Sequence, residues 1–477
     1  MSTPGTELDE VILAFSESDP FTIRDACEGV QIFGASGSGK TSGSGRLFAL
    51  SYLNAGFGGL VLTAKADEAD LWRQYARAAG RTADLIIVGP DERHRFNILD
   101  YEWSHSGAGA GRSRNLVELF LTLAEIASRG SAKNLSDNER YWRNELQKLL
   151  ANSIDTLRLS LEPITFLNLH KIVQSAPRSE EHLIDTEWLQ SSFCVQTNAK
   201  AEQRKQDNAL SPSDVQDFEL TSDYWLDEFP RMHDRPRTSI TGSFTGMADV
   251  FLRSPLRELF STTTTFTPDD CLDGKIIVLD LPTKKFNEVG IYAQVLFKYC
   301  WERAIERRRT TDQSRPVFLW ADESQFFVNE HDIRFQSTAR GYRAATVFLT
   351  QNLPNYHFYL GGDSRAESMT EALIGNLATK IFHNNTCTKT NHYASELFSR
   401  TWRRKVSSNA SVQDQRIVAG RSYSDELLSE VDPIEFTRLA TGGPGYDFVV
   451  EGIVHRAGRT FNANGKNHIR SSFDQRL

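Results

Sequence analysis

The segment Gly34-Ala35-Ser36-Gly37-Ser38-Gly39-Lys40-Thr41 constrains the fold more than any other part of this 477-residue sequence. It follows an apolar run, Val30-Gln31-Ile32-Phe33, which predicts a strand, and residues 40–53 after it predict a helix. Glycines let the backbone N–H groups of such a loop turn toward phosphates, and a helix N-terminus favours negative charge. The pattern GxxxxGK[ST] between a strand and a helix therefore indicates a phosphate-binding loop.

Two side chains of this loop have specific predicted roles. Lys40 would reach the β- and γ-phosphates of a nucleotide, and the hydroxyl of Thr41 would bind Mg²⁺. The alternative is a glycine- and serine-rich loop without a ligand, which the strand and helix on either side disfavour. The residues expected to contact the nucleotide are Gly34, Ala35, Ser36, Gly37, Ser38, Gly39, Lys40, Thr41 and Ser42.

A phosphate-binding loop needs an acidic partner on a neighbouring strand, and the run 316–323 supplies one. This run is an apolar strand that ends in Asp322 and Glu323. We expect Asp322 to bind Mg²⁺, directly or through water, and Glu323 to orient and deprotonate the attacking water. The second carboxylate favours hydrolysis over a switch that only binds nucleotide.

Polar residues farther along the chain complete the expected site. Gln351 follows a predicted strand, residues 346–350, and could sense the γ-phosphate from the tip of that strand. Arg340 or Arg343 could act as an arginine finger that stabilises the transition state in a neighbouring subunit. The alternative, equally compatible with the spacing, is that both arginines pair with surface carboxylates.

Apolar runs alternate with helical stretches in residues 1–104 and again in residues 256–477, which predicts an α/β fold with a mainly parallel sheet. The segment between them, 105–255, has helical patterns and predicts an inserted all-α domain. Within it, a polar stretch at 198–214 is expected to separate helices. Residues 402–425 are polar and serine-rich and predict a hairpin or an exposed loop.

The formal net charge of −8 excludes DNA binding by bulk attraction, so any DNA contact must use a local basic surface. The N-terminal residues are acidic and do not resemble a signal peptide. No run approaches the roughly 18 apolar residues that span a bilayer. We expect a soluble protein of the cytoplasm without a transmembrane segment, which a membrane or channel partner protein would recruit to the inner membrane.

With these motifs in view, the sequence resembles the type IV secretion and conjugation coupling-protein ATPases of the TraG/TraD type, within the HerA–FtsK group of P-loop motors. The similar segments occur in the family's order over most of residues 25–460: 63–67 is similar to "DPKGE", 90–100 to "P...FNPLD", Tyr141-Trp142 to the start of the family's all-α domain, 274–282 to "GK..IYLDLP", 340–352 to "GR..G…LQS", and 373–399 to the segment that follows.

This resemblance implies a RecA-like P-loop NTPase core and a ring, expected to be a hexamer, that hydrolyses ATP with Mg²⁺. Such a ring would pull single- or double-stranded DNA, or a DNA–protein substrate, through its channel. The resemblance also favours Arg340 over Arg343 as the arginine acting across the subunit boundary. ATP rather than GTP is expected from the resemblance and from the absence of an NKxD guanine motif.

The sequence departs from the family at two places. The family has two N-terminal membrane helices, whereas about 30 residues precede the P-loop strand here, and only Lys65 is kept outright in the "DPKGE" segment. Two alternatives therefore stay open. One is a soluble HerA-like ATPase of DNA processing or anti-phage defence, and the other is an ATP-gated assembly scaffold with little turnover.

Overall fold

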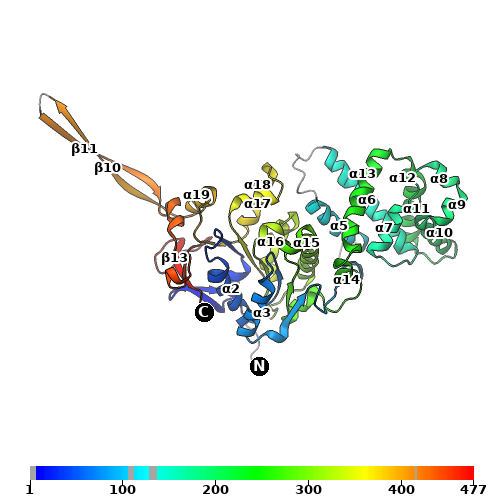
Figure 1. Ribbon diagram of the computed structural model, residues 1–477, viewed down its shortest axis with the longest axis horizontal. Helices are drawn as coiled ribbons and strands as arrows, with labels where there is room; N and C mark the ends of the chain where they lie inside the picture. The colour runs from blue at the N-terminus through cyan, green and yellow to red at the C-terminus, as the bar shows by residue number, and fades with distance from the viewer. Residues whose placement is uncertain (1–6, 106–111, 128–136, 414–415, 477) are drawn as a thin grey trace.

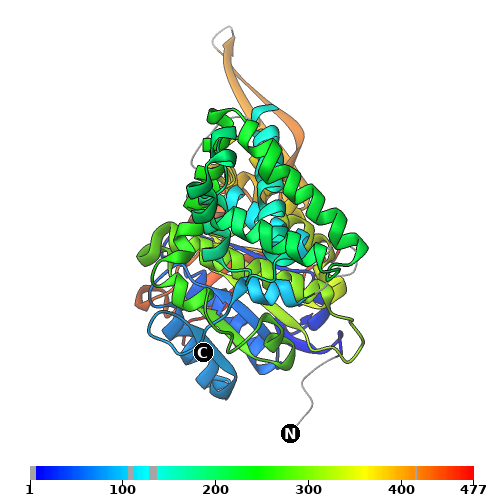
Figure 2. The ribbon, with the colours of Figure 1, turned by 90° about the vertical axis from the view of Figure 1, so that its right-hand side faces the viewer.

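The computed structural model describes residues 7–105, 112–127, 137–413 and 416–476. Figure 1 shows a long molecule with a central α/β body, a helical body at one end and a thin β-ribbon at the other. Figure 2, turned by 90°, shows the ribbon rising behind the helical body, on the side of the molecule away from the N-terminus. No helix in the described part of the chain combines the length and apolarity that crossing a membrane requires.

A nine-stranded sheet of order β13-β12-β9-β3-β8-β7-β4-β6-β5 forms the centre of the α/β body. Seven of its strands run parallel, while β12 and β13 pair antiparallel at one edge. The predicted α/β class with a mainly parallel sheet is confirmed. The strands are β3 Val30–Phe33, β4 Gly58–Leu62, β5 Leu85–Val88, β6 Ile276–Leu279, β7 Val317–Ala321, β8 Ala344–Thr350, β9 Thr379–Phe382, β12 Val449–Arg456 and β13 His468–Asp474.

The strand order corrects one expectation. The acidic strand β7 is not the direct neighbour of the P-loop strand β3, because β8 pairs with both of them. The carboxyl ends of parallel strands meet at one edge of a sheet. The residues after β3, β7 and β8 therefore lie side by side, with Gln351 after the middle strand.

Helices cover both faces of the sheet because its apolar strands are buried on both sides. On one face, Phe48 and Tyr52 of α2 and Trp72 of α3 pack against residues such as Val61 and Phe318. On the other face, α15 contributes Leu296 and Phe297. The helices of this body are α1 Ile23–Cys27, η1 Thr41–Gly45, α2 Arg46–Asn54, α3 Glu68–Ala78, η2 Thr82–Asp84, α4 Ile98–Ser104, η5 Pro268–Asp273, α15 Thr283–Arg307, η6 Ser324–Phe326, α16 Glu330–Thr338, η7 Ala339–Tyr342, α17 Leu353–Tyr359, α18 Ser364–Gly375, α19 Thr388–Leu397, η8 Pro433–Arg438 and η9 Pro444–Tyr446.

The helical body lies beyond the α15 side of the sheet (Figure 1). The expected break at residues 198–214 is wrong over its first half, since α10 continues to Gln206. The segment Phe193–Gln206 is rich in good helix formers, and Ser192 caps its first turn. The helices are α5 Arg112–Ala127, α6 Asp137–Leu159, α7 Phe166–Gln174, α8 Glu180–Ile184, α9 Thr186–Ser191, α10 Phe193–Gln206, α11 Pro212–Asp223, η4 Tyr224–Glu228, α12 Phe229–Arg231, α13 Asp234–Leu252 and α14 Leu256–Phe260.

Two hairpins in the described part of the chain lie outside the central sheet. At the N-terminal side, β1 (Val11–Ser16) pairs with β2 (Asp19–Thr22). The polar segment predicted as a hairpin or loop forms a longer ribbon, β10 (Arg400–Gln413) with β11 (Arg416–Ser429), whose tip residues 414–415 lie outside the described part. Strands of 14 residues extend about 45 Å, so the ribbon reaches well beyond the α/β body.

Candidate active site

The predicted phosphate-binding loop joins β3 to a helix that begins with a π-helical turn, η1. Gly37 and Gly39 have φ angles of +74° and +82°, in the left-handed region that favours glycine. A Cβ at Gly39 would lie 2.4 Å from Cγ2 of Val450 in β12. Glycine is therefore required at position 39 for two reasons. One is the left-handed backbone conformation, and the other is the close approach of β12.

A cavity of about 370 Å³ opens in front of this loop. Ala35 through Ser42 line it, as do Lys65, Glu323 and residues of α2 and α3. The buried hydroxyl of Ser38 has no hydrogen-bond partner within the described part of the chain. A loop of small residues with an unpaired donor matches the requirements of a phosphate group, so these residues suit a nucleotide.

Asp322 lies at the end of β7 beside the loop, as predicted. Its Oδ2 accepts a 2.8 Å hydrogen bond from the hydroxyl of Thr41 and another of 2.8 Å from Nζ of Lys65. Burial by itself would raise the pKa of Asp322, but the charges of Lys65 and Lys40 hold that pKa below its ordinary value. An ionised carboxylate next to the Thr41 hydroxyl offers the oxygen ligands that Mg²⁺ prefers.

Glu323, the next residue, is buried with its backbone in the left-handed region, at φ 50° and ψ 47°. For a residue with a side chain this conformation costs about 1–3 kcal/mol, which the surrounding contacts must offset. Its carboxylate lies 3.5 Å from Nζ of Lys40 and accepts a 2.9 Å hydrogen bond from the amide of Gln325. The strained backbone aims this carboxylate toward the loop rather than along the strand.

Gln351 follows β8, between the loop and the acidic pair. Its amide donates to Oε1 of Glu323 at 3.2 Å and to Oε2 at 3.4 Å. The backbone carbonyl oxygen of Gln351 accepts a 2.7 Å hydrogen bond from the side-chain amide of Asn385. The structure thus brings Lys40, Thr41, Asp322, Glu323 and Gln351 together at the carboxyl edge of the sheet.

Sequence reasoning assigned no role to three side chains of this site. The resemblance to the "DPKGE" segment includes Lys65 without giving it a role, yet Lys65 forms an ion pair with Asp322. Gln325 lies beside the acidic pair in the sequence, which was a usable signal. His383 gave no signal, because only the fold brings its Nε2 to 2.6 Å from the hydroxyl of Ser44 in η1.

Glu68 is a further buried acid beside Asp322, at the start of α3. It accepts a 2.7 Å hydrogen bond from the backbone N–H of Ala64 and lies 3.9 Å from Nζ of Lys65. Burial, together with the charge of Asp322, raises the pKa of Glu68 to about 8. The raised pKa favours the protonated form of Glu68, and Lys65 lies closer to Asp322, at 2.8 Å, than to Glu68.

The two candidate finger arginines lie at the other edge of the sheet, before β8 begins. Arg343 is buried and donates a 3.0 Å hydrogen bond to the carbonyl oxygen of Ser314, so its guanidinium is engaged within its own chain. Arg340 is 62% exposed at its side chain and pairs with Glu28 at 3.1 Å. The seven residues of β8 span about 20 Å, so Arg340 cannot reach the loop of its own chain.

No protein-family model matches the sequence, and no match occurs among curated protein sequences. Solved structures do match. The unbound bacterial conjugative coupling protein TrwB has a TM-score of 0.53 at 14% identity, with 98% of this chain and 89% of that chain covered.

Structures of TrwB in complex with nucleotides match this chain to a similar extent. The complex with the non-hydrolysable GTP analogue GDPNP has a TM-score of 0.58 at 13% identity and covers 98% of this chain and 91% of that one. The complex with ADP and Mg²⁺ has a TM-score of 0.56 at 12% identity and covers 98% of this chain and 89% of that one. At the level of the fold, the resemblance to coupling proteins is confirmed: the chain has the RecA-like P-loop architecture of the plasmid coupling protein TrwB.

Proposed function

We propose that the protein is an ATPase that couples hydrolysis to the movement of DNA, in the manner of a conjugative or type IV secretion coupling protein. The observation that carries the proposal is the meeting of Lys40, Thr41 and the Asp322-Glu323 pair at one sheet edge. The fold of TrwB, whose structures include complexes with ADP and Mg²⁺, supports a nucleotide at this edge.

In the proposed reaction, the loop amides and Lys40 hold the phosphates of ATP. Thr41 and Asp322 would hold Mg²⁺, which supplies charge neutralisation on the phosphate oxygens. Glu323 takes a proton from the water that attacks the γ-phosphorus, and the bond to the β-phosphate oxygen breaks to give ADP and phosphate. Gln351 and Gln325 hold the Glu323 carboxylate in place through their amide donors.

The ion pair between Lys40 and Glu323 has a consequence for this cycle. Both side chains are more than nine-tenths buried, at 7% and 8% exposure, and the two charged atoms lie 3.5 Å apart. A γ-phosphate attracts Lys40 away from this pair, which frees Glu323 to act on water. Nucleotide binding and activation of the base are thereby linked in one movement of Lys40.

Arg340 would complete the site from a neighbouring copy. Its exposure and its place at the sheet edge opposite the loop favour action across a subunit boundary over action within its own subunit. The pair with Glu28 is the surface alternative that the sequence left open, and this pair would have to break on assembly. We therefore propose a homo-oligomeric ring, of six copies by the family resemblance, that works in the cytoplasm and is held at the inner membrane by a partner protein.

The test is ATP hydrolysis by purified protein, with and without single- and double-stranded DNA. Lys40→Ala should abolish nucleotide binding, and Glu323→Gln should keep binding but lower kcat by about 100-fold or more. Lys389→Ala, a change of an exposed lysine on α19, is the matched control and should behave as wild type. Stable oligomers that hydrolyse no ATP and ignore DNA would overturn the motor and favour a scaffold gated by ATP.

A further inference from the structure

The β10–β11 ribbon exposes apolar side chains that no other described residue of the chain covers. Residues directly opposite in an antiparallel pair share a face, so Trp402 lies beside Leu427 and Val406 beside Tyr423 on the same face. Trp402 is 69% exposed and Tyr423 is 61% exposed. A two-stranded ribbon is marginally stable in water by itself, and exposed apolar side chains in a row indicate a binding surface.

The ribbon also differs in charge from the rest of the protein. Residues 400–429 contain six basic and three acidic residues, a net charge of +3 in a chain of −8. The remainder of the chain therefore carries −11. On the face that carries Trp402, Arg404 pairs with Asp425 at 3.0 Å, whereas Arg400 forms no ion pair with any described residue. The surface that suits the ribbon is acidic with exposed apolar groups.

Such a surface lies on the helical body. A groove of about 870 Å³ between α6, α11 and η4 is lined by six carboxylates and two basic side chains, with Tyr141 and Leu220 exposed at 49% and 70%. Asp223, on this groove, has no ion-pair partner among the residues described. The acidic side chains of the groove thus match the basic ribbon in charge, and its exposed apolar side chains match those of the ribbon.

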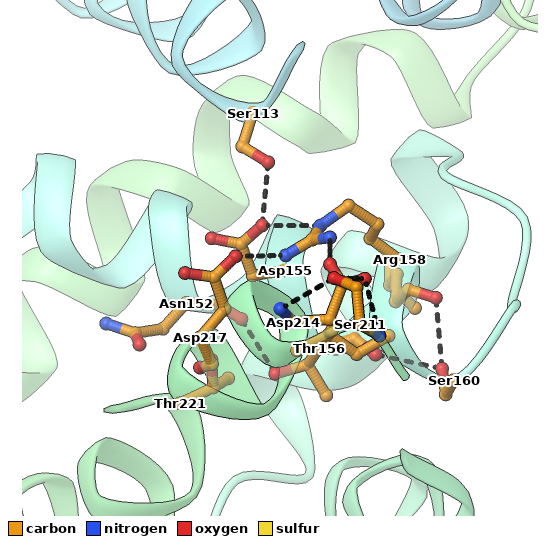
Figure 3. A network of polar contacts seen from close by, with 12 residues as sticks. Ser113, Asn152, Asp155, Thr156, Arg158, Ser160, Ser211, Asp214, Asp217 and Thr221 are labelled. Atoms are coloured by element: carbon orange, nitrogen blue, oxygen red, sulfur yellow. Dashed lines mark hydrogen bonds and ion pairs between the residues drawn. The ribbon is translucent and has the colours of Figure 1, made fainter. Parts of the chain in front are cut away.

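Ion pairs hold together the two helices, α6 and α11, that form the walls of this groove. Figure 3 shows Arg158 of α6 between three carboxylates, Asp155 on its own helix and Asp214 and Asp217 on α11. The guanidinium contacts Asp155 at 3.0 Å and Asp217 at 2.7 Å, and Asp214 is its third partner. Arg158 therefore holds α6 and α11 in register, so the groove is a formed surface before anything binds to it.

We infer that the β10–β11 ribbon of one copy docks in the α6–α11–η4 groove of a neighbouring copy. The ribbon and the helical body lie at opposite ends of the long axis, so a chain cannot fill its own groove with its own ribbon (Figure 1). Contact between unlike ends of two copies is a heterologous interface, which closes into a ring when the rotation between copies allows it. Tryptophan, tyrosine and arginine are the side chains that dominate such interfaces.

This inference rests on the oligomeric part of the proposed function, and it competes with the alternative that the ribbon binds nucleic acid. The aliphatic residues Val406 and Leu427 favour a protein surface, because nucleic acid offers phosphates and base faces but little aliphatic contact area. A protein interface also uses both ends of the molecule, whereas DNA binding would leave the acidic groove without an occupant.

The test compares the assembly of wild type and variants by native mass spectrometry and sedimentation, with and without ATP analogue and DNA. The double variant Trp402→Ser/Tyr423→Ser should weaken association at least tenfold. Phe358→Ser is the matched control, since Phe358 is 72% exposed outside the ribbon and should leave assembly unchanged. Unchanged assembly of the ribbon variant, or a wild type that stays monomeric in every condition, overturns the inference.

A charge exchange supplies the second arm. Arg400→Glu and Asp223→Lys should each weaken association, and the two changes combined in one chain should restore it. Loss of DNA affinity in the ribbon variants with intact assembly would assign the ribbon to nucleic acid and overturn the inference. Failure of the proposed function is distinguishable, because Lys40→Ala should abolish hydrolysis without changing any association that depends on the ribbon.

Discussion

The side-chain amide of Gln351 donates to both carboxylate oxygens of Glu323, at 3.2 Å and 3.4 Å, across the gap between two neighbouring strands. This contact links the tip of β8 to the proposed general base. β8 is also the strand that begins shortly after Arg340, so one strand extends from the candidate base to the end of the sheet where Arg340 lies. A shift of β8 would reach Glu323 through Gln351.

Replacing Gln351 by alanine should lower kcat by about 10- to 100-fold, because Glu323 loses an orienting donor while its carboxylate remains. Affinity for a non-hydrolysable ATP analogue should stay within about twofold of wild type, since Gln351 does not line the cavity. Steady-state hydrolysis and analogue titration measure the two quantities. A large loss of analogue affinity with normal kcat would instead place Gln351 in nucleotide binding.

Arg340→Ala should lower hydrolysis by roughly 100-fold or more if the guanidinium acts in a neighbouring site. Mixing this variant with Glu323→Gln should restore part of the activity, because about a quarter of the interfaces in a random ring then pair two intact residues. Well-mixed oligomers that recover nothing would argue against action in trans. Arg343→Ala serves as the contrast: its arginine is buried, so the change should lower the free energy of unfolding.

Gly39→Ala should destabilise the fold and abolish nucleotide binding. The left-handed φ of +82° costs alanine about 1–2 kcal/mol, and the added methyl group would meet Val450 at 2.4 Å. Gly375→Ala is the matched control, because a Cβ there meets nothing within 4 Å. Thermal unfolding and analogue titration should separate the two variants; equal behaviour would show that the loop tolerates a side chain.

Because His383 is buried as a neutral ring, we expect the protein to lose stability in acid. Burial lowers the pKa of His383 to about 4, and its Nδ1 lies 2.8 Å from the carbonyl oxygen of Glu451, which only accepts. The neutral ring therefore donates from Nδ1 and accepts the Ser44 hydroxyl at Nε2. The unfolded chain, with an ordinary histidine pKa of about 6.5, binds the proton first as pH falls.

The stability that the neutral His383 ring contributes is complete above about pH 6.5 and is lost as pH falls toward 4, by up to about 3 kcal/mol. His383→Gln should flatten this part of the stability profile, since glutamine does not titrate. Chemical unfolding of both proteins at several pH values between 4 and 8 measures the difference. Parallel profiles would show that His383 titrates alike in the folded and unfolded chain.

The strands and the acidic pair could be predicted from the sequence because their signals are local. The loop Gly34–Thr41 needs a fixed spacing of glycines, and β7 is a continuous apolar run that ends at Asp322. The break expected at residues 198–214 was wrong where polar residues still have high helix propensity. Polarity alone does not end a helix; the next capping motif, at Ser211, marks the actual restart.

The rest of the site depends on long-range pairing, which a single sequence does not encode in a readable way. The placement of β8 between β3 and β7 follows from crossovers, not from any residue pattern within the strands. His383 meets Ser44 across 339 positions of the chain, and Lys65 meets Asp322 across 257. These pairs form only because the order of strands in the sheet brings their segments together.

The phosphate-binding loop contacts β12 and Gln475, which are synthesised long after the loop itself. The amide of Gln475 donates 2.6 Å to the hydroxyl of Ser42, and these residues lie 433 positions apart. At translation rates of about 5–20 residues per second, the loop waits roughly 20 to 90 s for this partner to be made. Until then the nascent chain holds the glycine loop without the contact between Ser42 and Gln475, and the sheet without β12 and β13 at its edge.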